Sequence, residues 1–254
     1  MVRLHAALIA LAASLAAVAA NAAELKVISA GAVRSIIADM IEDYSRQTGH
    51  KFTFTTGPTG QLRSVIASGE HADLIIVSAP LMAELEKTGK LTPGSRVDLG
   101  RIGLGVVIRD GGAAPDVSTP EAFKQLLIRA KSIAYTDPKL GGTSVLHLMK
   151  LAEQFGIRDE VTRKGIHATG GNDASAKVAQ GEAEISVTLI SEIGEAKGAK
   201  LAAPLPEALQ LWTVYAAAIP LASTAPNEAR AFIAALTGPA LRARWTEAGW
   251  QPAK

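Results

Sequence analysis

Apolar segments of strand length alternate along this chain with longer stretches whose apolar residues recur every three or four positions. The helical spacing is clear in residues 33–44, and glycines such as Gly49 and Gly69 would end the helices. The strand candidates are residues 25–29, 51–55, 73–77, 102–108, 132–136, 164–168, 185–189 and 212–219. Strands that alternate with helices in this way predict an α/β fold with mostly parallel sheets flanked by helices.

Several of the strand candidates run directly into turns that are rich in small and hydroxyl-bearing residues. Such turns lie at residues 28–34, 55–60, 135–144 and 187–190. A helix that begins just beyond a buried strand points unpaired backbone N–H groups and the positive end of its dipole at the turn. Small residues let a ligand come close to that backbone. We therefore expect these turns to share one ligand, and we expect that ligand to be an anion.

The first 22 residues have the pattern of a secretory signal peptide. They carry Arg3, then an apolar run, and they end in small residues, so that cleavage is expected after Ala22. The apolar run, residues 6–20, is shorter than the ~20 residues that span a bilayer. The chain has no cysteine for a lipid anchor or a disulfide. We therefore expect export to the periplasm, with no membrane insertion of the mature chain.

Charge and composition exclude several classes of partner. A net charge of +2 is too small to favour nucleic acid, and only 4% of the residues are aromatic, which disfavours a stacking platform for bases or sugars. The sequence contains no P-loop, no dinucleotide fingerprint, no Gly-x-Ser-x-Gly motif and no His/Asp/Glu cluster at metal-ligand spacing. We expect a small anionic ligand, no nucleic-acid partner, no cofactor and no metal.

Two long strand candidates suggest that the chain passes twice between lobes. They are residues 101–108, followed by a loop rich in glycine, alanine and proline, and residues 211–220. If both cross, residues 23–103 together with 213–254 form one lobe and residues 104–212 form the other. The ligand would then lie in the cleft between the lobes, at the carboxyl ends of the strands.

The order of several short motifs carries a family resemblance over nearly the whole mature chain. The motifs are Gly57-Pro-Thr-Gly60, residues 69–78, Tyr135-Thr-Asp-Pro138 with the glycines at 141 and 142, and residues 177–185. In this order and spacing they resemble the periplasmic molybdate-binding proteins of ABC transporters. The resemblance implies a two-lobed type II periplasmic binding protein fold that closes on its ligand. It also implies an inner-membrane ABC permease as partner, and we expect a monomer.

The positions that would hold molybdate differ from the family pattern. In the family, two serines and a tyrosine surround the tetrahedral oxyanion. The matching positions of this chain carry Ala32, Thr59 and Thr188. Because all three positions carry a different residue and Ala32 has no hydroxyl, the sequence disfavours molybdate.

Two arginines near these positions favour a different anion. Arg34 lies at the start of the first helix and Arg63 lies four residues after Thr59. A guanidinium matches a carboxylate with two parallel hydrogen bonds. We therefore expect an organic polycarboxylate rather than molybdate, although each arginine could also be an ordinary surface residue.

Further candidates come from the turns themselves. The ligand-binding set also includes Gly60, Ser78, Gly142, Thr143 and Ser144. Hydroxyl residues at these places could serve only as helix caps, and the glycines could serve only to permit unusual backbone angles. The turn at residues 169–173 could also reach the cleft, with Asn172 as a donor.

Two classes of function remain open. The first is a receptor that captures a small anion for an ABC transporter. The second is an enzyme on the same scaffold, because some proteins that resemble molybdate-binding proteins act as periplasmic aconitate isomerases. That allylic proton shift needs a base but no cofactor, and His147 is the candidate base if the protein is an enzyme. His147 could instead face the core or the surface.

Overall fold

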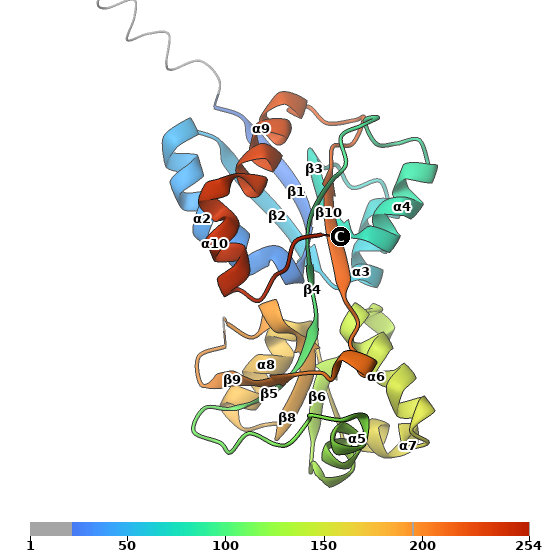
Figure 1. Ribbon diagram of the computed structural model, residues 1–254. Coiled ribbons are helices and arrows are strands. Elements are labelled where there is room, and N and C mark those ends of the chain that lie inside the picture. Colours follow the sequence, from blue (N-terminus) through green and yellow to red (C-terminus); the bar gives the residue numbers. More distant parts are fainter. Residues whose placement is uncertain (1–21, 195, 254) are drawn as a thin grey trace, which may run out of the picture.

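The computed structural model describes residues 22–194 and 196–253, and its strands form two separate five-stranded sheets, one in each of two lobes (Figure 1). The two-lobed α/β fold expected from the sequence is confirmed. Except for Ala22, the predicted signal peptide lies outside the described residues. Within the described part of the chain, no helix has the length and apolar character required to cross a membrane.

The first sheet has the strand order β2-β1-β3-β10-β4. β1 runs parallel to β2 and β3, whereas β10 runs antiparallel to β3 and β4. The strands are β1 (Glu24–Ala30), β2 (Lys51–Gly57), β3 (Leu74–Ser78), β4 (Val97–Ile102) and β10 (Thr213–Ala218).

The second sheet has the order β7-β6-β8-β5-β9 and the same balance of directions. β6 runs parallel to β7 and β8, and β5 runs antiparallel to β8 and β9. The strands are β5 (Leu104–Arg109), β6 (Ile133–Thr136), β7 (Gly165–Ala168), β8 (Ile185–Leu189) and β9 (Ala199–Pro204). Each sheet is therefore mostly parallel, as the sequence predicts, with one reversed strand: β10 in the first sheet and β5 in the second. Parallel neighbours need a crossover connection, usually a helix, whereas β5 and β10 enter their sheets directly from the other lobe.

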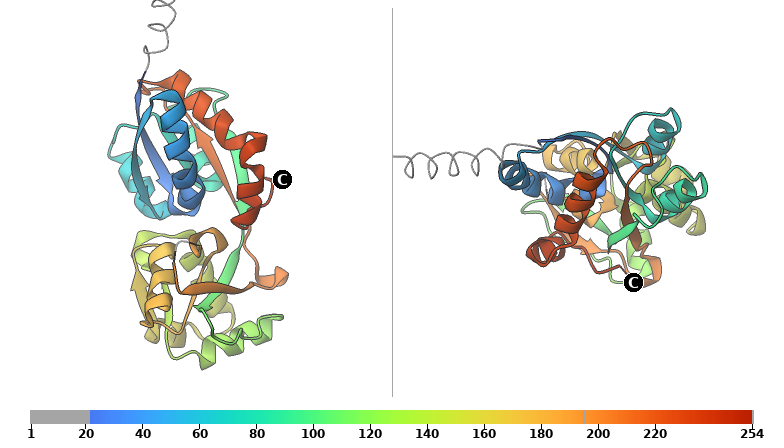
Figure 2. Two further views of the ribbon diagram at one scale, coloured as in Figure 1. Left: turned by 90° about the vertical axis from the view of Figure 1, so that its left-hand side faces the viewer. Right: turned by 90° about the horizontal axis from the view of Figure 1, so that it is seen from above.

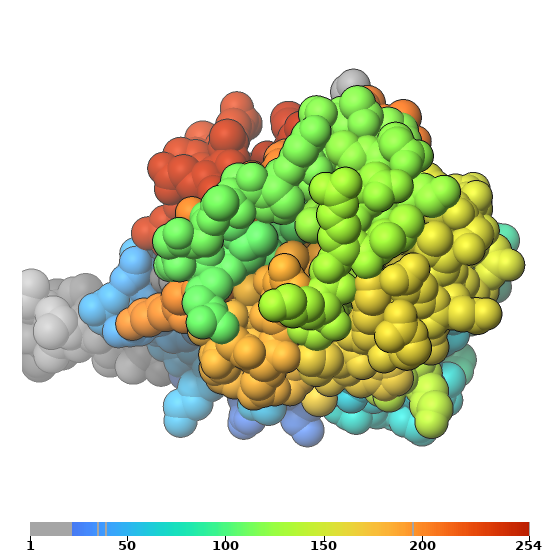
Figure 3. Space-filling view, turned by 90° about the horizontal axis from the view of Figure 1, so that it is seen from below, coloured from blue at the N-terminus to red at the C-terminus, as the bar shows by residue number. Residues whose placement is uncertain are grey.

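Helices flank both sheets. In the first lobe they are α2 (Arg34–Thr48), α3 (Thr59–Ala67), α4 (Ala79–Lys87), α9 (Pro226–Thr237) and α10 (Pro239–Glu247). In the second lobe they are α5 (Pro120–Arg129), α6 (Thr143–Gln154), α7 (Arg158–Arg163) and α8 (Gly171–Gln180). Short 3₁₀ turns are η1 (Gly31–Val33), η2 (Pro138–Leu140), η3 (Ile190–Glu192) and η4 (Glu207–Leu209). The loop after β5 and helices of the second lobe cover its outer end (Figure 3).

The periodic pattern after residue 32 forms α2, as the sequence predicts. Val33, Ile36 and Ile37 are buried against the first sheet's core. Gly49 ends the helix in a left-handed conformation with φ of 75°, and its N–H donates to the Ser45 carbonyl. Glycine adopts this conformation without the steric cost that a Cβ would add.

Two segments of the chain pass between the lobes, side by side (Figure 2). β4 continues into β5 through Gly103, and the stretch after η4 returns to β10. The Gln210 side chain joins the two segments, because its Oε1 accepts from Leu104 N at 2.7 Å and its Nε2 donates to Leu104 O at 3.0 Å. Strands within residues 24–102 and 213–218 form the first sheet, and strands within residues 104–204 form the second.

The buried carboxylate of Asp73 joins two parts of the first lobe that are far apart in the sequence. Asp73 is 1% exposed and accepts hydrogen bonds from the backbone N–H groups of Lys26 and Thr224 at 2.9 and 2.8 Å. The hydroxyls of Ser223 and Thr224 also donate to it. Burial alone would raise the pKa of Asp73, but these donors hold it below its ordinary value of 3.8. The carboxylate thereby ties the loop before α9 to β1.

Replacing Asp73 by Asn should lower the free energy of unfolding by about 3 kcal/mol, because hydrogen bonds to a buried charged group each contribute about 1.5–3 kcal/mol. Urea unfolding followed by circular dichroism measures the change. Asp98→Asn is the matched control: Asp98 pairs with Arg96 at 2.9 Å on the surface and is 41% exposed, so its loss should cost less than about 1 kcal/mol. Equal effects of the two substitutions would contradict this role of Asp73.

The same carboxylate predicts an acid dependence. Because the pKa of folded Asp73 lies below that of the unfolded chain, its stabilisation is complete above the unfolded value and is lost as the pH falls through the folded one. Urea unfolding at pH 5 and at pH 3 should therefore show a larger loss of stability for the wild type than for Asp73→Asn. An identical loss would rule out the linkage.

Candidate functional site

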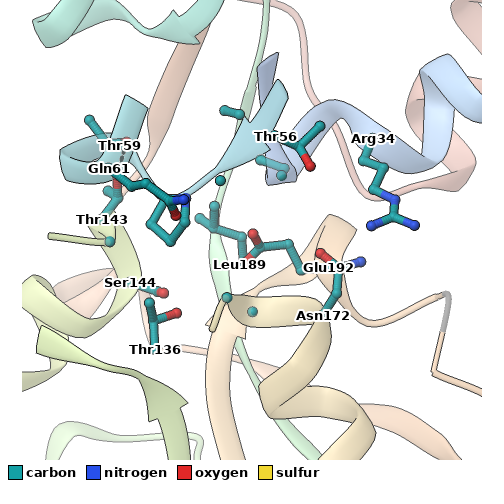
Figure 4. A pocket seen from close by; sticks show the side chains of 18 of the residues that line it. Arg34, Thr56, Thr59, Gln61, Thr136, Thr143, Ser144, Asn172, Leu189 and Glu192 are labelled. Carbon is teal, nitrogen blue, oxygen red and sulfur yellow. Dashed lines mark hydrogen bonds between the residues drawn. The ribbon is translucent and has the colours of Figure 1, made fainter. Parts of the chain in front are cut away.

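Residues of both lobes line a cavity of about 320 Å³ where the two sheets face each other (Figure 4). From the first lobe and β10 come residues 30–32, 34, 56–59, 61 and 215, and from the second lobe come residues 136, 142–144, 169–173, 189 and 192. Most of these positions lie at the ends of strands or in the turns that follow them. The cavity therefore lies where the sequence predicts a shared site.

Helices of both lobes begin at this cavity. η1 with α2, α3, α6 and α8 all have residues of their first turn in its lining. Their N-cap residues, which are Ala30, Pro58, Gly142 and Gly170, make no capping hydrogen bond through a side chain. The first-turn N–H groups are therefore not capped by these residues, and the positive ends of the helix dipoles point at one volume. Such an arrangement suits an anion.

Charged groups stand on one side of the cavity. Arg34 begins α2, and its guanidinium lies on the side where Asn172 of α8 is found (Figure 4). Asp173 caps its own turn, because its Oδ2 accepts from Thr169 N at 2.8 Å and from the Thr169 hydroxyl at 3.2 Å. Since a cation at a helix N-terminus is disfavoured by the dipole, the position of Arg34 is better suited to a bound anion than to helix stability.

A carboxylate also lines the cavity. Glu192, in η3 directly after β8, is only 8% exposed. The Thr188 hydroxyl donates to its Oε2 at 2.7 Å. A Cβ at Gly171 would overlap with both Glu192 Oε2 and Thr188 Oγ1, so only glycine lets α8 begin this close to the pair. The start of α8 and the carboxylate are thus packed together.

Tyr215 of β10 also lines the cavity. Its side chain is 2% exposed, and burial raises the pKa of the phenol. The nearby charge of Glu192 raises this pKa further, while a hydrogen bond with Thr143 opposes the shift. Tyr215 is therefore a neutral hydroxyl group at any physiological pH.

The lobes touch at one edge of the cavity. The hydroxyls of Thr59 and Thr143 lie 3.3 Å apart, and Gly60 N donates to Gly141 O at 3.2 Å (Figure 4). These contacts join the start of α3 to the turn before α6. The lobes are thus closed on each other at this edge.

Six of the residues singled out from the sequence line the cavity. They are Ala32, Arg34, Thr59, Gly142, Thr143 and Ser144. Asn172, from the turn at residues 169–173, lines it as well.

The other singled-out residues lie outside the lining. Gly60 contacts the second lobe, Ser78 is buried at the start of α4, and Thr188 is buried beneath Glu192. Arg63 faces α4, where its Nε and Nη2 each lie 3.0 Å from a carboxylate oxygen of Glu84. His147 is turned to η4, with Nε2 2.7 Å from Leu209 O.

Several lining residues were not singled out from the sequence, namely Thr56, Gln61, Thr136, Glu192 and Tyr215. Glu192 carried a usable signal, because it lies three residues after the strand candidate 185–189, at the carboxyl end where site residues gather. Tyr215 lies inside a strand, and nothing in its sequence context distinguishes it from a core residue. Across residues 22–194 and 196–253, no group of three or more His, Asp or Glu side chains could hold a metal ion.

Replacing Gly60 by Ala should open the lobes. The added Cβ would lie 2.6 Å from Leu140 O and 2.9 Å from Gly141 Cα, and both are backbone atoms of the other lobe that cannot rotate away. Small-angle X-ray scattering should therefore show a larger radius of gyration for Gly60→Ala than for the wild type. Ser64→Ala, one turn further along α3 and exposed, should scatter like the wild type. Identical curves for all the proteins would contradict the proposed contact.

Comparison with known proteins agrees with this geometry. Residues 25–251 match the family described as bacterial extracellular solute-binding proteins. Aconitate isomerase of a Pseudomonas species is 28% identical over 214 residues, which cover 82% of this chain and 80% of the relative. Molybdate-binding protein ModA of Azotobacter vinelandii is 31% identical over 193 residues, covering 73% of this chain and 72% of the relative.

A solved structure supports the same fold. The periplasmic molybdate-binding protein of Azotobacter vinelandii superimposes with a TM-score of 0.74 at 20% identity, covering 91% of this chain and 100% of that one. At this identity the likeness bears on the fold alone. With the family match over nearly the whole described chain and the relative above 30% identity, the chain belongs to the bacterial extracellular solute-binding proteins, among those that resemble molybdate-binding proteins.

Proposed function

We propose that this protein is a periplasmic receptor that binds a small organic polycarboxylate between its lobes and delivers it to an ABC transporter. The observation that carries the proposal is the meeting of helix N-termini from both lobes with Arg34 at one cavity. In this proposal residues 1–22 direct export and are removed, the mature protein acts as a monomer, and the lobe surfaces contact an inner-membrane permease. The membership in the extracellular solute-binding family supports the location and the partner.

The lining favours a carboxylate over molybdate. Ala32 offers no hydroxyl, and the hydroxyl of Thr188 is engaged with Glu192 beneath the cavity. Thr59, Thr143 and Ser144 place hydroxyls on one side, where those of Thr59 and Thr143 bond to each other, and Arg34 supplies a planar fork on another. A volume of about 320 Å³ lies within the range of small organic ligand sites, roughly 300–1,000 Å³, so it suits a molecule larger than one tetrahedral oxyanion.

Arg34→Ala should weaken binding of citrate or trans-aconitate about 10- to 100-fold, because a charge-assisted bond contributes about 1.5–3 kcal/mol. Isothermal titration calorimetry of the mature protein measures the change. Arg63→Ala is the matched control, since Arg63 also lies in an early turn of a helix but pairs with Glu84 outside the cavity. Its affinity should equal that of the wild type.

Other results would overturn the proposal. Equal affinities of the wild type and Arg34→Ala would remove Arg34 from the site. Wild-type binding of molybdate without binding of any tricarboxylate would replace the polycarboxylate by the oxyanion that the Azotobacter relative's name states.

A second candidate function is an isomerase that interconverts trans- and cis-aconitate, as the name of the Pseudomonas relative states for that protein. The observation that favours it is the carboxylate of Glu192 in the wall of a cavity otherwise suited to an anion. A negative group beside an anion lowers the affinity for that anion, whereas a proton-transfer enzyme requires a base there.

In this scheme Glu192 replaces His147 as the proposed base, because His147 faces Leu209 O rather than the cavity. Glu192 takes a proton from the methylene carbon of trans-aconitate, and the electron pair spreads over the allylic system and its carboxylates. The first-turn N–H groups and Arg34 stabilise that charge. The proton returns to the other end of the allyl unit, so that one C–H bond breaks, another forms and the double bond moves.

Glu192→Gln should reduce the conversion of trans- to cis-aconitate at least 100-fold, which is the lower end of what general base catalysis contributes, about 10²- to 10⁴-fold. Chromatography of the two isomers measures the rate. His147→Gln, which keeps a polar contact for Leu209 O, should turn over like the wild type. If the wild type itself shows no turnover, the isomerase is excluded and the receptor remains.

A further inference from the structure

We propose that Glu192 decides which anions the cavity accepts: it admits an anion that turns a hydrogen-bearing group toward it and rejects an oxyanion whose oxygens are all bare. This inference rests on the proposed anion site and adds a selection rule to it. It does not depend on whether the protein also catalyses a reaction.

Glu192 lies where it would touch a bound anion. The side chain reaches the centre of the lining from η3, between Leu189 and Asn172 (Figure 4). Its other oxygen lies toward the opposite lobe, since a Cβ at Gly31 would be 3.3 Å from Glu192 Oε1. An anion held by the first turns of α2 and α8 would therefore be in contact with this carboxylate.

The surroundings fix Glu192 in place. The Thr188 hydroxyl donates to Oε2 from within a buried strand, and the absence of a side chain at Gly171 allows α8 to begin against the same oxygen. The charged or titratable groups that share the cavity are Arg34, Asp173 and Tyr215. The negative charge of Glu192 is one cause of the raised pKa of Tyr215, after burial. The carboxylate is thus an oriented acceptor and not a mobile surface charge.

The chemistry of an ionised carboxylate supplies the selection rule. It accepts hydrogen bonds and donates none. Against a bare oxygen of molybdate or sulfate, two negative acceptors would meet at a side chain that is only 8% exposed, which is repulsive. A hydroxyl, a protonated oxygen or an acidic methylene group turns the same contact into an attraction, and a hydroxyl makes it a charge-assisted hydrogen bond.

The first test compares substitutions of this carboxylate. Calorimetry at pH 8 measures citrate, trans-aconitate and molybdate binding to the wild type, Glu192→Gln, Asp173→Asn and Glu153→Gln. Glu192→Gln removes the charge and adds a donor at nearly constant shape, so it should bind molybdate at least 10-fold more tightly than the wild type and citrate less tightly. Asp173 also lines the cavity, but its carboxylate accepts a hydrogen bond from Thr169 N. Asp173→Asn removes the same charge and should give a smaller gain in molybdate affinity than Glu192→Gln. Glu153 pairs with Arg158 on the surface, and its replacement should change nothing.

A second measurement needs no substitution and keeps the test decisive if Glu192→Gln fails to fold. Hydrogen phosphate and sulfate are tetrahedral anions of similar size, and at pH 7 only the first carries a hydrogen. The wild type should bind phosphate at least 10-fold more tightly than sulfate. Equal affinities would overturn the inference.

The outcomes separate the inference from the proposed function. Citrate binding by the wild type with no gain of molybdate affinity in Glu192→Gln would overturn the inference and leave the receptor. Failure of the wild type to bind any tricarboxylate, with a clear gain of molybdate affinity in Glu192→Gln, would overturn the polycarboxylate and leave the selection rule. Tight binding of molybdate by the wild type would overturn the rule.

Discussion

The meeting of helix N-termini at the junction of the lobes is the interaction on which the rest of the structure depends. Helices α2 and α3 bring the dipoles of the first lobe to the cavity, and α6 and α8 bring those of the second. Aligned positive ends disfavour the approach of the lobes unless negative charge lies between them. Glu192 supplies a negative charge within the protein itself, and a bound anion would supply another.

Glu192 bears on two properties of the molecule, which are the approach of the two lobes and, in our proposal, the selection of the anion. A carboxylate that offsets the dipoles helps the lobes to lie together as in this structure, with contacts such as Gly60 N to Gly141 O. The same carboxylate limits the chemistry of anything that enters. If Glu192 selects the anion as proposed, one side chain, held by Thr188 and Gly171, affects both the approach of the lobes and the choice of ligand.

Sequence reasoning reached the fold and about a third of the lining residues, for physical reasons that can be traced. Strand and helix periods, together with the turns after the strands, locate Ala32, Thr59 and the turn at residues 142–144. The antiparallel direction of β5 and β10 could not be predicted from the sequence, because it depends on how the chain passes between the lobes and not on the local residue pattern. Arg34 and Arg63 look alike in sequence, but only the fold shows that Glu84 of α4 lies beside Arg63. Tyr215 comes from a strand that pairs with β3 far away in the chain.

The amide of Gln210 also determines how this molecule can bend. It bonds both the N–H and the C=O of Leu104, so it joins the two crossing segments as a pair of backbone hydrogen bonds between strands would. Two strands tied in this way resist being pulled apart or sheared, but they can still twist together. Rotation of the lobes about the axis of these two segments should therefore disturb fewer hydrogen bonds than a motion that separates the segments, so we expect ligand binding to change the angle between the lobes.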